Sequence, residues 1–135
     1  YAITYFYNVY GKREISKGKY ATVIAKFLRL KKSKQEYLTI TKPGTQRRNF
    51  THVDDIISGL ILVAKKGQGD GYGIASNDSF SIFDLAKLLK MPYKLQKKKK
   101  GNRLDGKVNV TKTKKLGWKS QIKLNEYIKR NIDNN

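Results

Sequence analysis

The sequence predicts a single α/β domain. Apolar residues recur at helical spacing in four segments, and the short runs between them are rich in the β-branched and aromatic residues typical of strands. With 135 residues, of which 39% are hydrophobic, the chain has room for one modest core. We therefore expect one globular unit that covers residues 1–135.

The first third of the chain predicts two strands and one helix. Residues 2–7 favour a buried strand that ends at the turn of residues 10–11. Apolar spacings of three and four predict a helix over residues 20–30. Its buried face should consist of Tyr20, Val23, Ile24, Phe27 and Leu30. Residues 36–41 alternate as a short strand, and the Pro-Gly pair at 43–44 predicts a turn after it.

A second helix is expected to begin near Thr51. The hydroxyl of Thr51 and the acid at Asp54 have the spacing of a capping box, and Gly67 is a typical stop. Its buried stripe should consist of Ile56, Ile57, Leu60, Ile61 and Ala64.

The remaining segments predict two more helices. Residues 71–75 favour a strand, and residues 81–84 repeat the capping pattern ahead of a third helix. Residues 97–102 predict a basic, solvated loop, residues 108–110 a last strand, and residues 124–132 a closing helix.

The chain is strongly basic. Thirty Lys and Arg residues stand against ten Asp and Glu, which gives a net charge of +20 and raises nucleic acid as a partner. Lysine is abundant together with Asn, Ile and Tyr, as codon choice in an A/T-rich genome would produce, so solvated lysine-rich faces explain the charge without a ligand. Most aromatic residues occupy expected core positions and do not alternate with basic ones on a surface. A basic nucleic-acid-binding module is therefore the disfavoured alternative.

Several classes of protein are excluded. The absence of cysteine removes disulfides and thiolate metal sites, and one histidine cannot form an imidazole cluster, so we expect no metal site. No apolar run approaches the roughly 20 residues that span a bilayer. We expect a cytoplasmic protein with no membrane partner. The abrupt start inside a strand-like run suggests a piece of a longer protein.

Two arginines stand just ahead of the second helix. The turn of residues 43–50 carries Arg47 and Arg48. A guanidinium can hold a phosphate through two parallel hydrogen bonds, and a helix amino terminus adds free donors. Anion binding and two solvated arginines are equally good interpretations of this pattern alone.

An amide at Asn8 stands near the end of the first strand. It either satisfies backbone groups at the following turn or faces a ligand, because open α/β sheets bind ligands at the carboxyl ends of their strands.

The titratable residues form no recognisable catalytic group. Adjacent carboxylates on a helix point about 100° apart, so Asp54 and Asp55 are no acid/base pair, and Asp54 is assigned to capping. His52 lacks an evident nucleophile and is interpreted as structural. Tyr93 and Lys97 have Tyr-x-x-x-Lys spacing but do not lie on a long helix, so we interpret the match as accidental.

Five motifs in order resemble one known family. They are Tyr-Asn-Val-Tyr-Gly at 7–11, Gly-Thr-Gln-Arg-Arg-Asn-Phe-Thr-His-Val-Asp-Asp at 44–55, Tyr-Gly-Ile-Ala at 72–75, Arg103 with Asp105, and Leu-Gly-Trp at 116–118. This order resembles the extended short-chain dehydrogenase family and, within it, nucleotide-sugar enzymes similar to UDP-galactose 4-epimerase.

The resemblance implies roles for individual residues. Residues at the positions of Arg48 and Arg103 bind the nucleotide diphosphate or ribose in such enzymes. The implied substrate-binding set is Asn8, Arg48, Arg103, Leu38, Thr39 and Ile40, the last three beside the base. Tyr7 is implied to lie near the nicotinamide of the cofactor.

The resemblance also implies an architecture. It is a carboxyl-terminal substrate-binding lobe with the last strands of a Rossmann-like sheet, and the main NAD-binding half is absent. The family's glycine-rich loop and Tyr-x-x-x-Lys pair belong upstream of Asn8, so we expect no catalytic residue in this chain and no NAD bound to it alone, although the complete enzyme would use NAD.

The expected function is the binding of a nucleotide-sugar such as UDP-glucose or UDP-galactose, as part of an epimerase such as UDP-glucose 4-epimerase that is inactive alone. Lys12, Asn49 and Asn109 depart from the family's usual residues, so a dehydratase or reductase lobe stays an alternative. The oligomeric state stays open.

Overall fold

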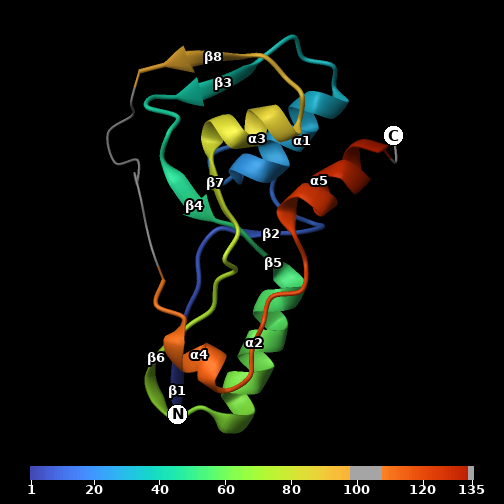
Figure 1. Cartoon of the computed structure of the whole chain (residues 1–135). Helices are drawn as coiled ribbons and strands as arrows, with labels where there is room; N and C mark the ends of the chain where they lie inside the picture. The colour runs from blue at the N-terminus through green and yellow to red at the C-terminus, as the bar shows by residue number, and fades with distance from the viewer. Residues whose placement is uncertain (98–107, 134–135) are drawn as a thin grey trace.

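The computed structural model describes residues 1–97 and 108–133, which form two stacked parts (Figure 1). The strands are β1 (Ala2–Tyr5), β2 (Val9–Tyr10), β3 (Leu38–Thr41), β4 (Arg47–Asn49), β5 (Thr51–His52), β6 (Gly69–Gly73), β7 (Ser79–Ser81) and β8 (Tyr93–Gln96). The helices are α1 (Val23–Lys32), α2 (Val53–Lys66), α3 (Ile82–Leu88), α4 (Thr111–Lys115) and α5 (Leu124–Asp133). The α/β class is confirmed.

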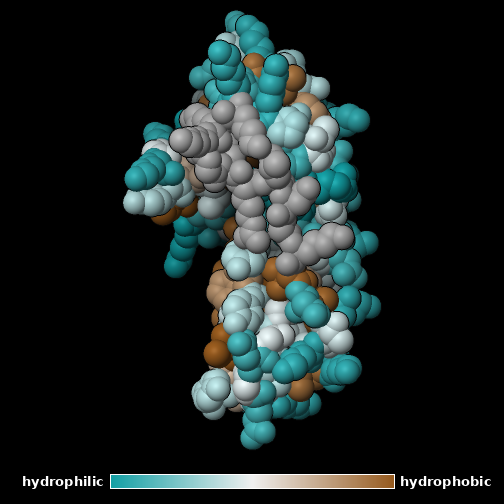
Figure 2. Space-filling view, turned by 90° about the vertical axis from the view of Figure 1, so that its left-hand side faces the viewer, coloured by the Kyte–Doolittle hydropathy of each residue, from teal (hydrophilic) through white to brown (hydrophobic). Residues whose placement is uncertain are grey.

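The strands pair two by two. Parallel pairs join β1 to β6, β2 to β5 and β3 to β8, whereas β4 and β7 are antiparallel. The lower part consists of β1, β6, α2 and α4, and the upper part holds α1, α3 and α5 with the β3–β8 and β4–β7 pairs (Figure 1). Figure 2 shows hydrophobic patches among hydrophilic side chains on one face of the lower part.

A cluster around Trp118 holds the lower part together. Trp118 packs with Ile56 and Ile74, and its Nε1 donates to the backbone oxygen of Asp55 at 3.0 Å. Gly59 allows this approach, because a Cβ there would lie 2.9 Å from Ile74 and 3.1 Å from the indole nitrogen. The Leu-Gly-Trp motif is therefore part of this small core.

The upper core is formed by three helices and the β3 strand. Apolar spacing on α1, α3 and α5 turns one face of each helix inward. The buried residues of this core include Ile24, Phe27, Leu28, Leu38, Ile40, Ile82, Leu85, Leu89, Leu124 and Ile128. The third helix has the predicted capping box between Ser81 and Asp84, and the closing helix is confirmed.

The first predicted helix begins later than expected. Residues 18–21 form a turn in which the Ala21 N–H bonds to Gly18, and α1 starts only after Thr22. Tyr20 is consequently 75% exposed and was wrongly placed on the buried face.

The start and stripe of α2 also differ from the prediction. The cap is His52, whose Nδ1 accepts the Asp54 N–H at 3.1 Å, while the Thr51 hydroxyl accepts the Ser76 N–H. Ile57 and Ile61 are 47% and 51% exposed. The stripe prediction was wrong for these two residues and for Ala64, because α2 turns Ile56, Gly59 and Val63 inward instead.

Two strand predictions were wrong, and one strand was missed. The first strand ends at Tyr5, is not buried, and is separated from β2 by residues 6–8. Residues 108–110 form no strand but lead into α4. Residues 93–96 form β8, which the sequence did not suggest. Of the predicted basic loop, residues 98–102 lie outside the described residues.

Among the described helices, none has the length and apolar character required to cross a membrane. Within residues 1–97 and 108–133, no group of three His, Cys, Asp or Glu side chains is arranged to hold a metal ion.

Candidate functional site

Strand β4 directs two adjacent arginines to opposite sides. Successive side chains of a strand point to opposite faces, so Arg47 and Asn49 line one cavity, whereas Arg48 lines two others. The candidate site is the set of these three cavities around β4. Asn8 lines the first and second cavities, and Arg48 lines the second and third, so the three adjoin.

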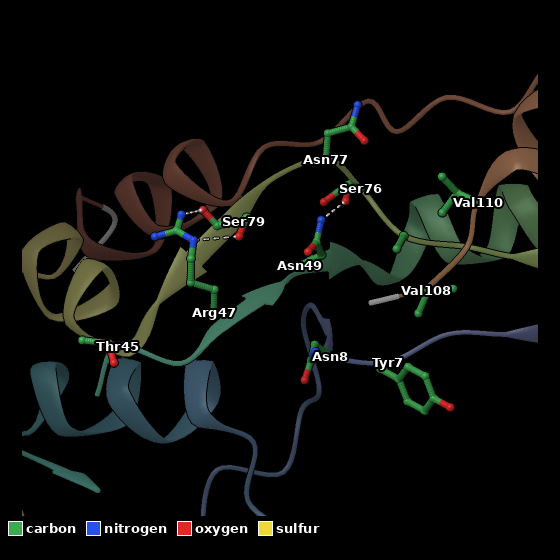
Figure 3. Close-up of a pocket in the computed structure, with 11 residues that line it drawn as sticks. Tyr7, Asn8, Thr45, Arg47, Asn49, Ser76, Asn77, Ser79, Val108 and Val110 are labelled. Carbon is green, nitrogen blue, oxygen red and sulfur yellow. Dashed lines mark hydrogen bonds between the residues drawn. The ribbon is translucent and has the colours of Figure 1, made fainter. Parts of the chain in front are cut away.

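The first cavity, of about 630 Å³, lies between the two parts of the molecule (Figure 3). One side is polar, with Asn8 and hydroxyl or amide side chains from the β4–β7 pair. The other side carries apolar groups and the ring of Tyr7, which is 45% exposed. Its apolar residues are Ala75, Val108 and Val110.

Arg47, in the wall of this cavity, forms hydrogen bonds that connect neighbouring elements. Its Nε and Nη2 donate to the side chain and backbone oxygens of Ser79 at 3.0 and 2.7 Å, and its Nη1 lies 3.3 Å from Asp84 (Figure 3 shows the Ser79 bonds). The pKa of Asp84 is lowered, mainly because its carboxylate accepts the Ser81 backbone N–H. Partial burial acts in the opposite direction, and the Ser81 hydroxyl and Arg47 lower the pKa further. Arg47 therefore joins β4 to β7 and α3.

Asn8 has a local reason for its residue type. Its backbone has a φ of 54°, in the left-handed region that Asn tolerates better than most residues, and its carbonyl accepts the Thr51 N–H at 3.2 Å. The left-handed backbone gives a local reason for asparagine at this turn, and the side-chain amide lines two cavities, where it can face a ligand.

The second and third cavities measure about 290 and 480 Å³. Half-buried Arg48 stands where they meet, and Thr39 and Ile40 line the third cavity. Leu38 and Ile40 lie on the same face of β3, are 0% and 1% exposed and belong to the upper core, so Thr39 is the one of these three residues whose side chain is exposed. Arg103 and Asp105 lie outside the described residues.

Glu14 was not found from the sequence. Its carboxylate accepts the Gly11 N–H at 2.6 Å and the Thr22 hydroxyl, and it lines the second cavity beside Arg48. Glu14 stands in a loop without periodicity, so only the folded contacts reveal its position.

The remaining titratable candidates are structural. His52 caps α2 through Nδ1, and the buried carboxylate of Asp55 accepts the N–H groups of Gln121 and Ile122. Tyr93 lies on β8 and packs against Phe83, so the Tyr-x-x-x-Lys spacing falls on a strand and not on a helix.

Comparison with known proteins places these features in a family. A family model described as the NAD dependent epimerase/dehydratase family matches residues 1–75, which is more than half of the chain. The chain belongs to the NAD-dependent epimerase/dehydratase family. The family recognised from the ordered motifs is thereby confirmed.

Individual members of the NAD-dependent epimerase/dehydratase family show how much of the fold this chain spans. UDP-glucuronic acid decarboxylase 6 of Arabidopsis thaliana is 30% identical over 132 residues, which are 92% of this chain and 37% of that protein. The putative UDP-glucose 4-epimerase of Methanocaldococcus jannaschii is 30% identical over 139 residues, or 98% of this chain and 45% of that protein. The chain thus spans less than half the length of these relatives.

A solved family structure has the same fold. The UDP-glucose 4-epimerase of Thermotoga maritima, determined with UDP-glucose, superposes with a TM-score of 0.84 at 28% identity. The superposition covers 98% of this chain and 45% of the epimerase. The α/β arrangement is therefore that of a partial epimerase domain.

Proposed function

We propose that this chain is the nucleotide-sugar-binding part of an NAD-dependent epimerase such as UDP-glucose 4-epimerase. The supporting observation is the position of Arg48. It lies where the second and third cavities meet, between the amide of Asn8 at one end and Thr39 and Ile40 at the other. A guanidinium midway along an extended cleft suits a diphosphate between a sugar and a base.

The ligand would follow the three cavities in order. The sugar would lie in the first cavity near Asn8, and the diphosphate in the second beside Arg48. The base would lie in the third cavity beside β3, against the exposed side chain of Thr39, while the side chains of Leu38 and Ile40 are buried in the upper core. Arg103 is proposed as a second diphosphate ligand on the basis of its motif alone.

The residues present fit only the nicotinamide end of NAD. Exposed Tyr7 and the apolar side formed by Ala75, Val108 and Val110 suit a flat heteroaromatic ring at the first cavity. NAD, when bound, would take a hydride from a sugar carbon and return it. Asn8 and Arg48 would hold the nucleotide-sugar in the orientation that this transfer requires. We expect the chain alone to bind the nucleotide-sugar and to convert none of it.

The epimerase reaction is proposed because the Thermotoga maritima epimerase, determined with UDP-glucose, has the same fold. Coverage does not choose between the reactions, because a decarboxylase and a dehydratase relative match 92% and 97% of this chain. A dehydratase or reductase would use the same binding residues. Analysis of the product that the complete protein forms from UDP-glucose distinguishes these reactions.

The test is calorimetric titration of the chain with UDP-glucose and with UDP. Arg48→Ala should weaken binding about tenfold to a hundredfold, because a charge-assisted contact with the diphosphate is lost. Lys66→Ala is the control: it removes the same charge from an exposed residue that lines none of the three cavities, so it should change affinity by less than about twofold. Equal loss in both variants would sink the proposal.

A DNA duplex serves as the competing ligand in the same experiment. The basic nucleic-acid-binding module would be favoured by two results together. The wild type and Arg48→Ala would bind DNA with the same affinity, and neither UDP nor UDP-glucose would give a heat of binding. A separate incubation of the chain with NAD and UDP-glucose should yield no UDP-galactose.

A further inference from the structure

A groove outside the candidate site lies on the other side of the loop formed by residues 11–16. Two adjoining cavities of about 580 and 610 Å³ are enclosed by the residue 11–16 loop, α1 and α5. They share Lys12, Arg13, Lys32 and Tyr127 in their walls. Glu14 lines this groove and also the second cavity of the site, so the loop is the wall between them.

The groove has an excess of positive charge. Five cationic side chains line it against the three carboxylates of Glu14, Asp54 and Glu126. Some of these charged groups have hydrogen-bond partners within the chain: the Arg29 Nε donates to the Ser16 carbonyl, and Glu14 accepts from Gly11 and Thr22.

Four cations remain available in the groove, namely Lys12, Arg13, Lys32 and Arg130. Among the described residues, the ion pair between a guanidinium or ammonium group and a carboxylate is Arg47–Asp84, which includes none of these four cations. The carboxylate of Asp54 lies 3.7 Å from His52 Nδ1. The charge of the four cations is therefore not neutralised by a carboxylate in the part of the chain that is described.

One wall of the groove is formed by an aromatic cluster. The half-buried ring of Tyr127 packs against Tyr10 at 4.9 Å and against His52 at 5.5 Å between ring centroids. Arg13, which lines both cavities, has a φ of 72°, a conformation that is uncommon for a bulky residue. The four cations are exposed to solvent, and they stand around the two cavities of this groove.

We propose that this groove binds a compact anion with several phosphates, such as tripolyphosphate or the phosphate tail of a nucleotide. Each cavity has the volume of a small-ligand site. Arginine forks pair with phosphate oxygens, and the lysines add point charges. Single-stranded nucleic acid fits less well, because the aromatic rings in the lining, Tyr127 and His52, pack edge-to-face or tilted within their own cluster and present no stacking platform.

The experiment is a titration of the full chain with tripolyphosphate at about 150 mM salt. The test variant carries Lys12→Ala, Arg13→Ala and Arg130→Ala. The matched control carries Lys65→Ala, Lys66→Ala and Lys115→Ala, three exposed residues outside the groove, and loses the same charge. Thermal unfolding of both variants verifies that they are folded.

The proposal expects saturable binding that weakens about tenfold or more in the test variant and less than about twofold in the control. Equal weakening in both variants, or no saturable binding to the wild type, overturns it. Binding of a short single-stranded RNA is measured in the same way. If the wild type binds this RNA more tightly than tripolyphosphate and the test variant does not bind it, the proposal is overturned in favour of nucleic acid. Arg48→Ala should leave tripolyphosphate binding unchanged, which separates this groove from the proposed UDP-sugar cleft.

Discussion

Asp55 and Gln121 are joined across the lower part of the molecule. Both carboxylate oxygens of Asp55, on the first turn of α2, lie 3.1 Å from the backbone nitrogen of Gln121, 66 residues later. One of them also accepts the Ile122 N–H at 3.0 Å. The segment that leads into α5 is thereby tied to the start of α2.

Replacing Asp55 with alanine should cost about 3 kcal/mol of unfolding free energy, because two backbone N–H groups lose a charged acceptor that is only 4% exposed. Urea denaturation of the variant measures the loss. Asp54→Ala is the control and should cost less than about 1 kcal/mol, since its side chain is exposed. A similar loss in both variants would refute the structural role of Asp55.

The same helix shows what could and could not be predicted from the sequence. Helical spacing located α2, but its sequence is apolar on more than one side, so the spacing alone could not say which residues turn inward. The position of Trp118, far along the chain, determines that Ile56 and Gly59 face the core and that Ile57 does not. Strand β8 escaped prediction for a related reason, because it exists through its pairing with β3.

Two residues of the candidate site were predicted from their residue types, because an amide or a guanidinium at those positions suggested ligand binding. The amide of Asn8 and the guanidinium of Arg48 were singled out by the residues and the motif order, and both line the cleft. Glu14 was missed because its position depends on contacts with Gly11 and Thr22 in an irregular loop. The resemblance implied a binding role for Arg48 and not for Arg47, and the alternation of β4 supplies the structural difference, because the two side chains line different cavities.

Gly59→Ala tests the close packing of α2 on Trp118. Alanine favours a helix by about 1 kcal/mol over glycine, but the added methyl would lie 2.9 Å from Ile74. We expect net destabilisation of about 1–2 kcal/mol by chemical denaturation. In an Ile74→Ala background the penalty should become smaller, because only the 3.1 Å contact with the Trp118 indole nitrogen remains, and an unchanged penalty there would argue against the clash with Ile74.

The exposed side of α2 provides a comparison between neighbouring isoleucines. Ile56→Ala should cost about 2–4 kcal/mol, since the side chain is buried beside Trp118. Ile57→Ala removes the same atoms from a half-exposed position and should cost less than about 1 kcal/mol. Thermal or urea unfolding of the two variants measures both losses of unfolding free energy. A larger loss for Ile57→Ala than for Ile56→Ala would show that α2 turns a different face toward the core.

Acid should weaken the contribution of Asp84 to stability. The Ser81 backbone N–H, followed by the Ser81 hydroxyl and by Arg47, lowers the pKa of Asp84 in the folded state despite some burial. The stability gained from this carboxylate is therefore fully present above about pH 4, the ordinary range of an Asp, and is lost as pH falls through the lowered folded pKa.

Urea unfolding of the wild type and Asp84→Asn between neutral and strongly acidic pH measures this effect. The difference between the two proteins should shrink as the pH falls. Glu36→Gln, an exposed residue outside the network, serves as the control. A difference between wild type and Asp84→Asn that stays constant over the whole range would contradict the assignment.

The open side of β1 has a consequence for how the molecule behaves in solution. Among the described strands β1 pairs with β6 alone, and Ile3 and Tyr5 are exposed along it as Ile57 and Ile61 are along α2. Such edges invite contact between molecules. A net charge of +20 opposes every encounter, and salt shortens the reach of that repulsion. We therefore expect charge repulsion to keep these molecules apart in dilute buffer, and we expect concentrated salt to weaken that protection.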